Sequence, residues 1–287
     1  MKLITTIYDK RRMNDFLNYA DGIVLGSDIF SCRLNKSFSV SEINDFIHDL
    51  TLRGKEIFLL VNPLVTDCEM EIIKASLADV LVTLVTGIIV SDLGFIKMFA
   101  EMGYLNKIIY NPNTLLTNSF DFNYYSDSGI KGAFLSEELT KDEIVYILKH
   151  KKYQTFMTGL GYLNMFTSRR KLIKNFEEES HEKLNSKVVQ IKEEFRLDEI
   201  YQVKEDVFGT HVHRDKIFEC FDELDEFVDL DYLFLDSQFL DDDITLDTLK
   251  LYKGKLKLKD YQTKYPNHKF DKGFLYKKLV YIKESND

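Results

Sequence analysis

The sequence predicts an α/β fold, a (β/α)8 TIM-like barrel with an inserted antiparallel β element. Eight short apolar runs recur along the chain, and amphipathic stretches separate most of them. This alternation is typical of parallel strands connected by helices, and eight such units match a closed barrel. The runs are Leu3–Tyr8, Gly22–Gly26, Ile57–Asn62, Gly87–Asp92, Lys107–Asn111, Gly132–Ser136, Gln154–Thr158 and Tyr232–Asp236.

Helix-start signals lie between these runs. Ser39 with Glu42, and Thr140 with Glu143, match the capping box in which a hydroxyl and a carboxylate satisfy free backbone N–H groups. Asp67 is expected to cap a third helix. The expected helices are Asp15–Tyr19, Glu42–Arg53, Cys68–Leu77, Phe95–Met102 and Ile144–Lys149, with a short one at the start of Asn113–Ser128.

The regular alternation breaks after the seventh run. Lys187–Gln202 and Gly209–His213 alternate like strands, with no helix between them. We therefore expect an inserted antiparallel element of two or three strands at about residues 185–213, and a helix over Asp215–Phe227 that leads to the eighth strand. The predicted barrel domain covers residues 1–255, and residues 256–287 form a basic C-terminal tail.

Charge is unevenly distributed around a net value of −9. Residues 217–249 contain twelve Asp or Glu and no Lys or Arg, whereas residues 251–287 contain ten Lys and four acids. The basic tail either contacts a polyanion or docks on the acidic segment before it.

Composition limits the class of protein. Hydrophobic residues make up 45% of the chain, but no apolar stretch reaches transmembrane length, so no membrane partner is expected. The N-terminal stretch becomes charged too early for a signal peptide, and we expect a cytoplasmic location. Cys32, Cys68 and Cys220 form no CxxC pair, which predicts no disulfide framework, no iron–sulfur cluster and no tightly bound structural zinc.

Polar residues end several of the predicted strands. The carboxyl ends of barrel strands build the active site in this fold class, so these residues should surround one mouth. Each either binds a ligand or caps the next helix. The candidates are Asn62, Asp92, Asn111, Ser136 and Asp236.

The loop after the seventh strand contains two glycines and then Ser168, Arg169 and Arg170. Backbone donors and two guanidinium groups near a helix start suit a carboxylate or a phosphate. The alternative is an ordinary solvated basic helix start. The loop is neither a GxGxxG nor a Walker motif.

A second cluster combines carboxylates and imidazoles: Glu205, Asp206, Thr210 and His211, with His213 on the same strand face. Such a set binds a divalent metal weakly or performs acid–base chemistry. The alternative is a turn of hydrogen-bonded polar residues, since the spacing matches no zinc signature. Serine-hydrolase and cysteine-nucleophile motifs are not recognisable.

Four segments together resemble the collagenase-like peptidases of family U32. They are Gly87–Gly94, Ser136–Thr140, Phe156–Arg170 and Glu205–His211, in the family's order and spacing. The chain departs from the family signature at Gln154, where the family has Glu, and at Thr158, where it has His. The signature's cysteine pair is also missing.

The resemblance is to the shorter, cysteine-poor paralogue type, and it implies a role in tRNA wobble-uridine hydroxylation with prephenate as co-substrate. The chain would act as catalyst or as partner of a longer U32 paralogue. The family name implies a protease as the alternative, and a non-catalytic scaffold barrel is the third. Some members hold an iron–sulfur cluster through four cysteines, which three scattered cysteines do not supply.

Overall fold

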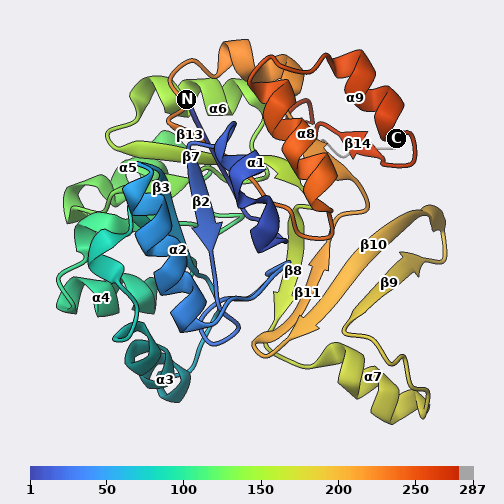
Figure 1. The fold of residues 1–287 in the computed structure, drawn as a ribbon. Coiled ribbons are helices and arrows are strands. Elements are labelled where there is room, and N and C mark those ends of the chain that lie inside the picture. The colour runs from blue at the N-terminus through green and yellow to red at the C-terminus, as the bar shows by residue number, and fades with distance from the viewer. Residues whose placement is uncertain (278–287) are drawn as a thin grey trace, which may run out of the picture.

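The computed structural model describes residues 1–277. Its central feature is a closed barrel of eight parallel strands, which confirms the predicted fold class (Figure 1). The barrel closes because the last strand pairs in parallel with both the first and the seventh. The barrel strands are β1 Lys2–Thr5, β2 Gly22–Leu25, β3 Glu56–Val61, β4 Gly87–Val90, β5 Ile108–Tyr110, β6 Gly132–Phe134, β7 Gln154–Gly161 and β13 Tyr232–Leu235.

The barrel interior is packed with side chains. Alternate positions of the strands point inward and form a cluster that includes Phe58, Phe134 and Phe156. The rings of Phe156 and Tyr232 stack with their centroids 4.4 Å apart. Because this layer fills the centre, a ligand has room only beyond the strand ends.

Helices surround the barrel and cover the outward faces of its strands (Figure 1). They are α1 Met13–Leu17, α2 Val40–Leu52, α3 Asp67–Leu77, α4 Leu93–Glu101, α5 Ser119–Tyr124 and α6 Lys141–His150. Short 3₁₀ turns occur at η1 Lys10–Arg12, η2 Val82–Leu84, η3 Leu105–Lys107 and η4 Ser126–Ser128. In the part of the chain described here, no helix is both long and apolar enough to cross a membrane.

The helix starts largely follow the prediction. The capping boxes at Ser39 and Thr140 are both present. The cap of α3 differs: Thr66, not Asp67, accepts the N–H of Glu69, and Asp67 is the first helical residue. The helix α5 begins later than expected because Asn118 caps it by accepting two backbone N–H groups.

The inserted element is an antiparallel sheet of four strands in the order β8-β11-β10-β9. Its strands are β8 Asn164–Ser168, β9 Val188–Glu193, β10 Arg196–Asp206 and β11 Gly209–His213, with α7 Leu172–Ser180 between β8 and β9. Figure 1 shows this sheet projecting from one side of the barrel. We expected two or three strands in this element, and the additional one is β8. The sequence predicts that its residues form a glycine-containing loop that binds a ligand.

The helix predicted over Asp215–Phe227 is wrong. Ile217–Glu219 forms β12 instead, and Phe221–Glu226 forms a 3₁₀ helix, η5. The strand pairs antiparallel with the end of β7, at Leu160 and Gly161, and parallel with β14 Phe270–Asp271. Partners distant in sequence therefore override the local helical pattern.

The C-terminal segment forms α8 Asp242–Tyr252, α9 Leu258–Lys264 and β14. Its lysines meet the acidic segment in two places. Lys264 lies 2.5 Å from Asp247, and Lys272 lies within 3.0 Å of each of three carboxylates, on Glu219, Asp222 and Glu223. Docking on the acidic segment thus accounts for these two charges, while residues 278–287 of the expected tail lie outside the described residues.

Candidate functional site at the barrel mouth

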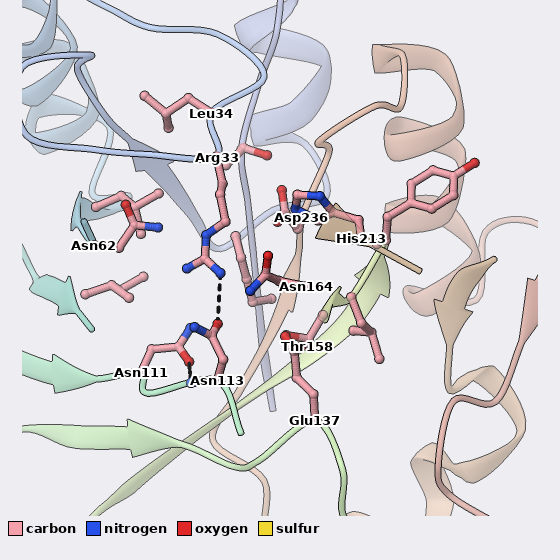
Figure 2. Close-up of a pocket in the computed structure, with 17 residues that line it drawn as sticks. Arg33, Leu34, Asn62, Asn111, Asn113, Glu137, Thr158, Asn164, His213 and Asp236 are labelled. Carbon is pink, nitrogen blue, oxygen red and sulfur yellow. Dashed lines mark hydrogen bonds between the residues drawn. The ribbon is translucent and has the colours of Figure 1, made fainter. Parts of the chain in front are cut away.

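A polar pocket lies at the carboxyl ends of the barrel strands (Figure 2). Asn62, Asn111 and Asp236 line it, and they follow β3, β5 and β13. These three were predicted from their positions at strand ends. The other polar residues that line the pocket are Thr6, Arg33, Asn113, Glu137, Thr158, Tyr162, Asn164 and His213.

Arg33 contributes the guanidinium of this pocket. It comes from the loop between β2 and α2, where its φ of 59° is unusual for a residue other than glycine. Its backbone N–H donates to Asp206 at 3.0 Å, and its Nη1 donates to Asn113 at 3.2 Å. Figure 2 shows the side chain extending towards Asn113 and Asn164. A guanidinium surrounded by amides is suited to bind a carboxylate through paired hydrogen bonds.

Asn164 connects this guanidinium to the inserted sheet. Only one orientation of its amide satisfies both polar atoms. In that orientation its oxygen accepts from Arg33 Nη1 at 3.2 Å and from Thr167 Oγ1 at 3.1 Å, and its nitrogen donates to the Phe166 carbonyl. Arg33 is therefore held by the barrel on one side and by β8 on the other.

Two carboxyl groups, those of Glu137 and Asp236, also face the pocket. Burial raises the pKa of Glu137 to about 7, with Arg33 opposing this shift and Asp236 adding to it. Its Oε1 accepts a long, 3.4 Å hydrogen bond from Thr158, while Oε2 is buried without a partner among residues 1–277. Burial likewise raises the pKa of Asp236, although the Gln238 N–H donates to its Oδ1. Glu137 therefore titrates near neutral pH, the range suited to proton exchange with a ligand.

His213 lines the pocket as a neutral imidazole. Burial lowers its pKa to about 3, helped by the nearby Arg33. The ring packs edge-on against Phe239 with the centroids 5.0 Å apart, and its Nδ1 is buried with no partner in the described part of the chain. Close by, Lys204 donates to the carbonyl of Leu34, and burial lowers its pKa.

Asp92 and Ser136 lie on the same rim but outside this pocket. Asp92 caps α4 by accepting the Gly94 N–H at 2.8 Å. Ser136 donates to the Thr114 carbonyl at 3.1 Å and accepts the Glu138 N–H at 3.2 Å. Both side chains thus stabilise the backbone of the loops at the rim.

The residues that the sequence predicted to bind an anion lie at the end of β8, away from the mouth pocket: Ser168, Arg169 and Arg170. Arg169 is exposed and forms an ion pair with Glu69 of α3 at 2.7 Å. Arg170 is also exposed, and its backbone N–H donates to Ser168 Oγ. The two arginines form a basic turn on the surface between β8 and α7.

The predicted cluster of carboxylates and imidazoles separates into two pairs of residues with different contacts. Glu205 and Thr210 hold the start of α7: Glu205 accepts the Ile173 N–H at 2.9 Å, and Thr210 accepts the Leu172 N–H at 2.9 Å. Asp206 and His211 instead face Cys32 from the β10–β11 hairpin, and these three offer a possible set of metal ligands. Burial raises the pKa of the Cys32 thiol to about 11.

The polar residues of the mouth that sequence reasoning missed include Arg33, Asn113, Glu137 and Asn164. None ends a strand, so the rule that selected Asn62 could not select them. A signal was available for Glu137 and Asn164, which lie within two segments that carried the family resemblance, Ser136–Thr140 and Phe156–Arg170.

A family model supplies the decisive comparison. The description "Peptidase family U32" matches residues 10–280. The chain belongs to peptidase family U32. This U32 protein is 24% identical over 289 residues to the tRNA hydroxylation protein P2 of Bacillus subtilis (strain 168), covering 91% of this chain and 93% of that protein.

A solved structure agrees with the family's fold. The U32 peptidase Mk0906 superposes with a TM-score of 0.52 at 12% identity, covering 82% of this chain and 92% of that one. At this identity the similarity shows the fold alone. The barrel of this U32 protein is therefore shared with a second member of its family.

Proposed function

We propose that this U32 protein takes part in tRNA hydroxylation, either as the catalyst or as the partner of a longer U32 paralogue. The observation that carries the proposal is the similarity to the Bacillus subtilis tRNA hydroxylation protein P2 along nearly the whole of both chains. Hydroxylation of the wobble uridine is the specific modification proposed. The expected location is the cytoplasm, where tRNA is modified.

The mouth pocket supports a small carboxylate as co-substrate, and prephenate is the proposed one. Arg33 presents a guanidinium beside the amides of Asn113 and Asn164. A guanidinium forms two parallel hydrogen bonds with a carboxylate, and amide N–H groups add further donors. The neutral form of Glu137 adds an O–H donor to the same set.

The basic turn supports contact with tRNA. Arg169 and Arg170 are exposed, and long-range attraction to phosphate does not require a preformed pocket. Lys272 of the tail contacts three carboxylates, whereas Arg169 has a single, exposed partner in Glu69. We assign the tRNA phosphate contact to Arg169 and Arg170.

The peptidase alternative has weaker support. Its best thiol candidate is Cys32, which is buried and donates to the Asn62 carbonyl at 3.5 Å. With its pKa raised to about 11, this thiol carries little of the thiolate that acts as nucleophile. His211 directs its two ring nitrogens to Thr167 and Asp206 and so does not activate Cys32.

The test is mass spectrometry of tRNA nucleosides from a strain that lacks this gene. The hydroxylated wobble uridine should disappear and should return with the parent gene. Arg33→Gln should fail to restore it, whereas Arg53→Gln should restore it, because Arg53 lies at the end of α2 and pairs with Asp49 outside the mouth. Unchanged nucleosides in the deletion strain would refute the proposal. Full restoration by Arg33→Gln would favour the scaffold role.

A further inference from the structure

Three potential metal ligands meet beside the mouth pocket. Cys32 comes from the loop after β2, while Asp206 and His211 come from the β10–β11 hairpin. The sulfur, one carboxylate oxygen and one ring nitrogen lie within 4.8 Å of one another. Cys32 and His211 are only 3% and 1% exposed. The barrel and the inserted sheet each supply part of this set.

The hydrogen bonds around His211 allow two positions for the ring proton. Thr167 Oγ1 has a single proton, which goes either to His211 Nδ1 or to the oxygen of Asn164. In the first case His211 Nε2–H donates to Asp206. In the second case Thr167 accepts at its 3.2 Å contact with Nδ1, the proton of the neutral imidazole is on Nδ1, and the lone pair of Nε2 points towards Asp206.

The second case places two acceptors against each other. His211 Nε2 lies 3.3 Å from both carboxylate oxygens of Asp206, longer than the usual 2.9–3.0 Å of an N–H···O bond. A lone pair facing a carboxylate is unfavourable unless a positive centre lies between them. A second proton on the ring would satisfy the imidazole and the carboxylate. A metal ion would bind those two groups and also the Cys32 sulfur, whose thiol otherwise donates to the Asn62 carbonyl.

The surrounding contacts orient the ligands as in metal sites. Thr167 fixes the ring through the nitrogen that would not bind the metal. Asp206 is positioned by the N–H groups of Arg33 and Phe208, each at 3.0 Å. In tetrahedral sites with bonds of about 2.0–2.3 Å, neighbouring ligand atoms lie roughly 3.3–3.7 Å apart. The ligand atoms, which lie within 4.8 Å of one another, would move closer by up to about 1–1.5 Å to reach that spacing.

We propose that Cys32, Asp206 and His211 form a binding site for a single zinc-type divalent ion. One sulfur, one nitrogen and one oxygen ligand suit zinc and cobalt, whereas magnesium and calcium prefer oxygen alone. On binding, the Cys32 thiol releases its proton to solvent. The thiolate and the carboxylate then balance the double charge of the ion, next to the cationic Arg33 and Lys204.

The site keeps one coordination position open. Three protein ligands leave a fourth tetrahedral position for water or a ligand group. Cys32 lines a pocket together with Arg33, Asn62 and Thr167. A ligand in that pocket would approach the ion and the guanidinium from the same side.

The test is a cobalt titration of the full chain after removal of metals by chelation. Cys68 is exposed and would bind cobalt adventitiously, so every protein carries Cys68→Ser. This parent should bind one equivalent of Co²⁺ with the absorption of a thiolate–cobalt bond, and Zn²⁺ should displace it. Cys32→Ser should abolish that absorption. Cys220→Ser is the matched control, because Cys220 is equally buried but lies against Tyr252.

Absence of the thiolate absorption in the parent would overturn the proposal, as would its persistence in Cys32→Ser or its loss in Cys220→Ser. The melting temperature provides a second measurement. Zinc should raise it in the parent and in Cys220→Ser, and should leave Cys32→Ser unchanged. If Cys32→Ser does not fold, the absence of both the absorption and the zinc-dependent rise in the parent would still refute the site. Neither readout depends on tRNA hydroxylation.

Discussion

Glu137 and Asp236 direct two partly buried carboxyl groups into one pocket, from the ends of β6 and β13, which flank β7 (Figure 2). The negative charge of Asp236 raises the pKa of Glu137, after burial as the main cause. The pocket therefore changes its charge near neutral pH. Binding of a carboxylate there should depend on the state of Glu137.

Glu137→Gln should remove a pH dependence of prephenate affinity. In the parent, affinity should fall as pH rises through about 7, because an ionised Glu137 repels the ligand's carboxylates. The glutamine variant should bind equally well from pH 6 to pH 8, as measured by calorimetry. Glu138→Gln is the control, since Glu138 is exposed and adjacent in sequence. A parent profile without pH dependence would contradict the assignment.

The same residue should affect stability. The folded pKa of Glu137, about 7, lies above the ordinary value of 4.5. Its contribution to the free energy of unfolding is therefore fully present below pH 4.5 and is lost as pH rises through 7. Glu137→Gln should be more stable than the parent at pH 8 relative to pH 5, as measured by urea denaturation. An identical pH dependence in both proteins would contradict the expectation.

Arg33→Gln should weaken binding of prephenate about ten- to a hundredfold, the usual effect of losing a charged hydrogen bond of about 1.5–3 kcal/mol. Arg33→Lys should restore little of it, because lysine cannot form the paired contact. The backbone N–H that donates to Asp206 remains in both variants. Equal affinity of the parent and the Lys variant would argue against a bidentate contact.

The double variant Arg169→Ala/Arg170→Ala should weaken binding of tRNA and reduce its salt dependence. The melting temperature should change by no more than a few degrees, since the ion pair of Arg169 with Glu69 is solvent-exposed and such pairs contribute little. Binding isotherms at two salt concentrations test this. Unchanged tRNA affinity would reduce the pair to ordinary surface charge, and a large loss of stability would make it structural.

Gly209→Ala should destabilise the inserted sheet by at least about 1 kcal/mol. Gly209 has a φ of 141°, and an added Cβ would lie 2.0 Å from the Ser168 carbonyl oxygen, so the backbone must shift. Gly103→Ala is the control, because it shares a positive φ but has open space around it. Urea denaturation compares the two. A smaller loss for Gly209→Ala than for Gly103→Ala would contradict the steric argument.

The barrel could be predicted because its strands are short and buried on both faces, which makes each one a visible apolar run. Capping boxes at Ser39 and Thr140 were visible for a similar reason, since they are local in sequence. The segment 215–227 was mispredicted because its structure depends on Leu160, Gly161 and Phe270. Local pattern carries no information about such partners.

The candidate site shows the same division. Asn62, Asn111 and Asp236 follow from the rule that parallel strands end on one side of a barrel. Arg33 does not, since its position depends on Asp206, 173 residues later in the chain. The sequence also predicted an anion-binding site that includes Arg169 and Arg170. Because residues 164–168 form strand β8 instead of a loop, these two arginines lie on the surface and not at the mouth.

The pairing of β1 with β13 has a consequence for synthesis of the chain. Lys2 pairs with Tyr232 and Thr5 pairs with Leu235. The first strand to be synthesised therefore cannot complete its pairing until one of the last strands has been made. Until residue 235 has left the ribosome, β1 and β7 each lack their β13 neighbour and expose backbone donors and acceptors on that side. The nascent barrel is then open and prone to pairing with other chains. The barrel therefore stays open until most of the chain has been synthesised.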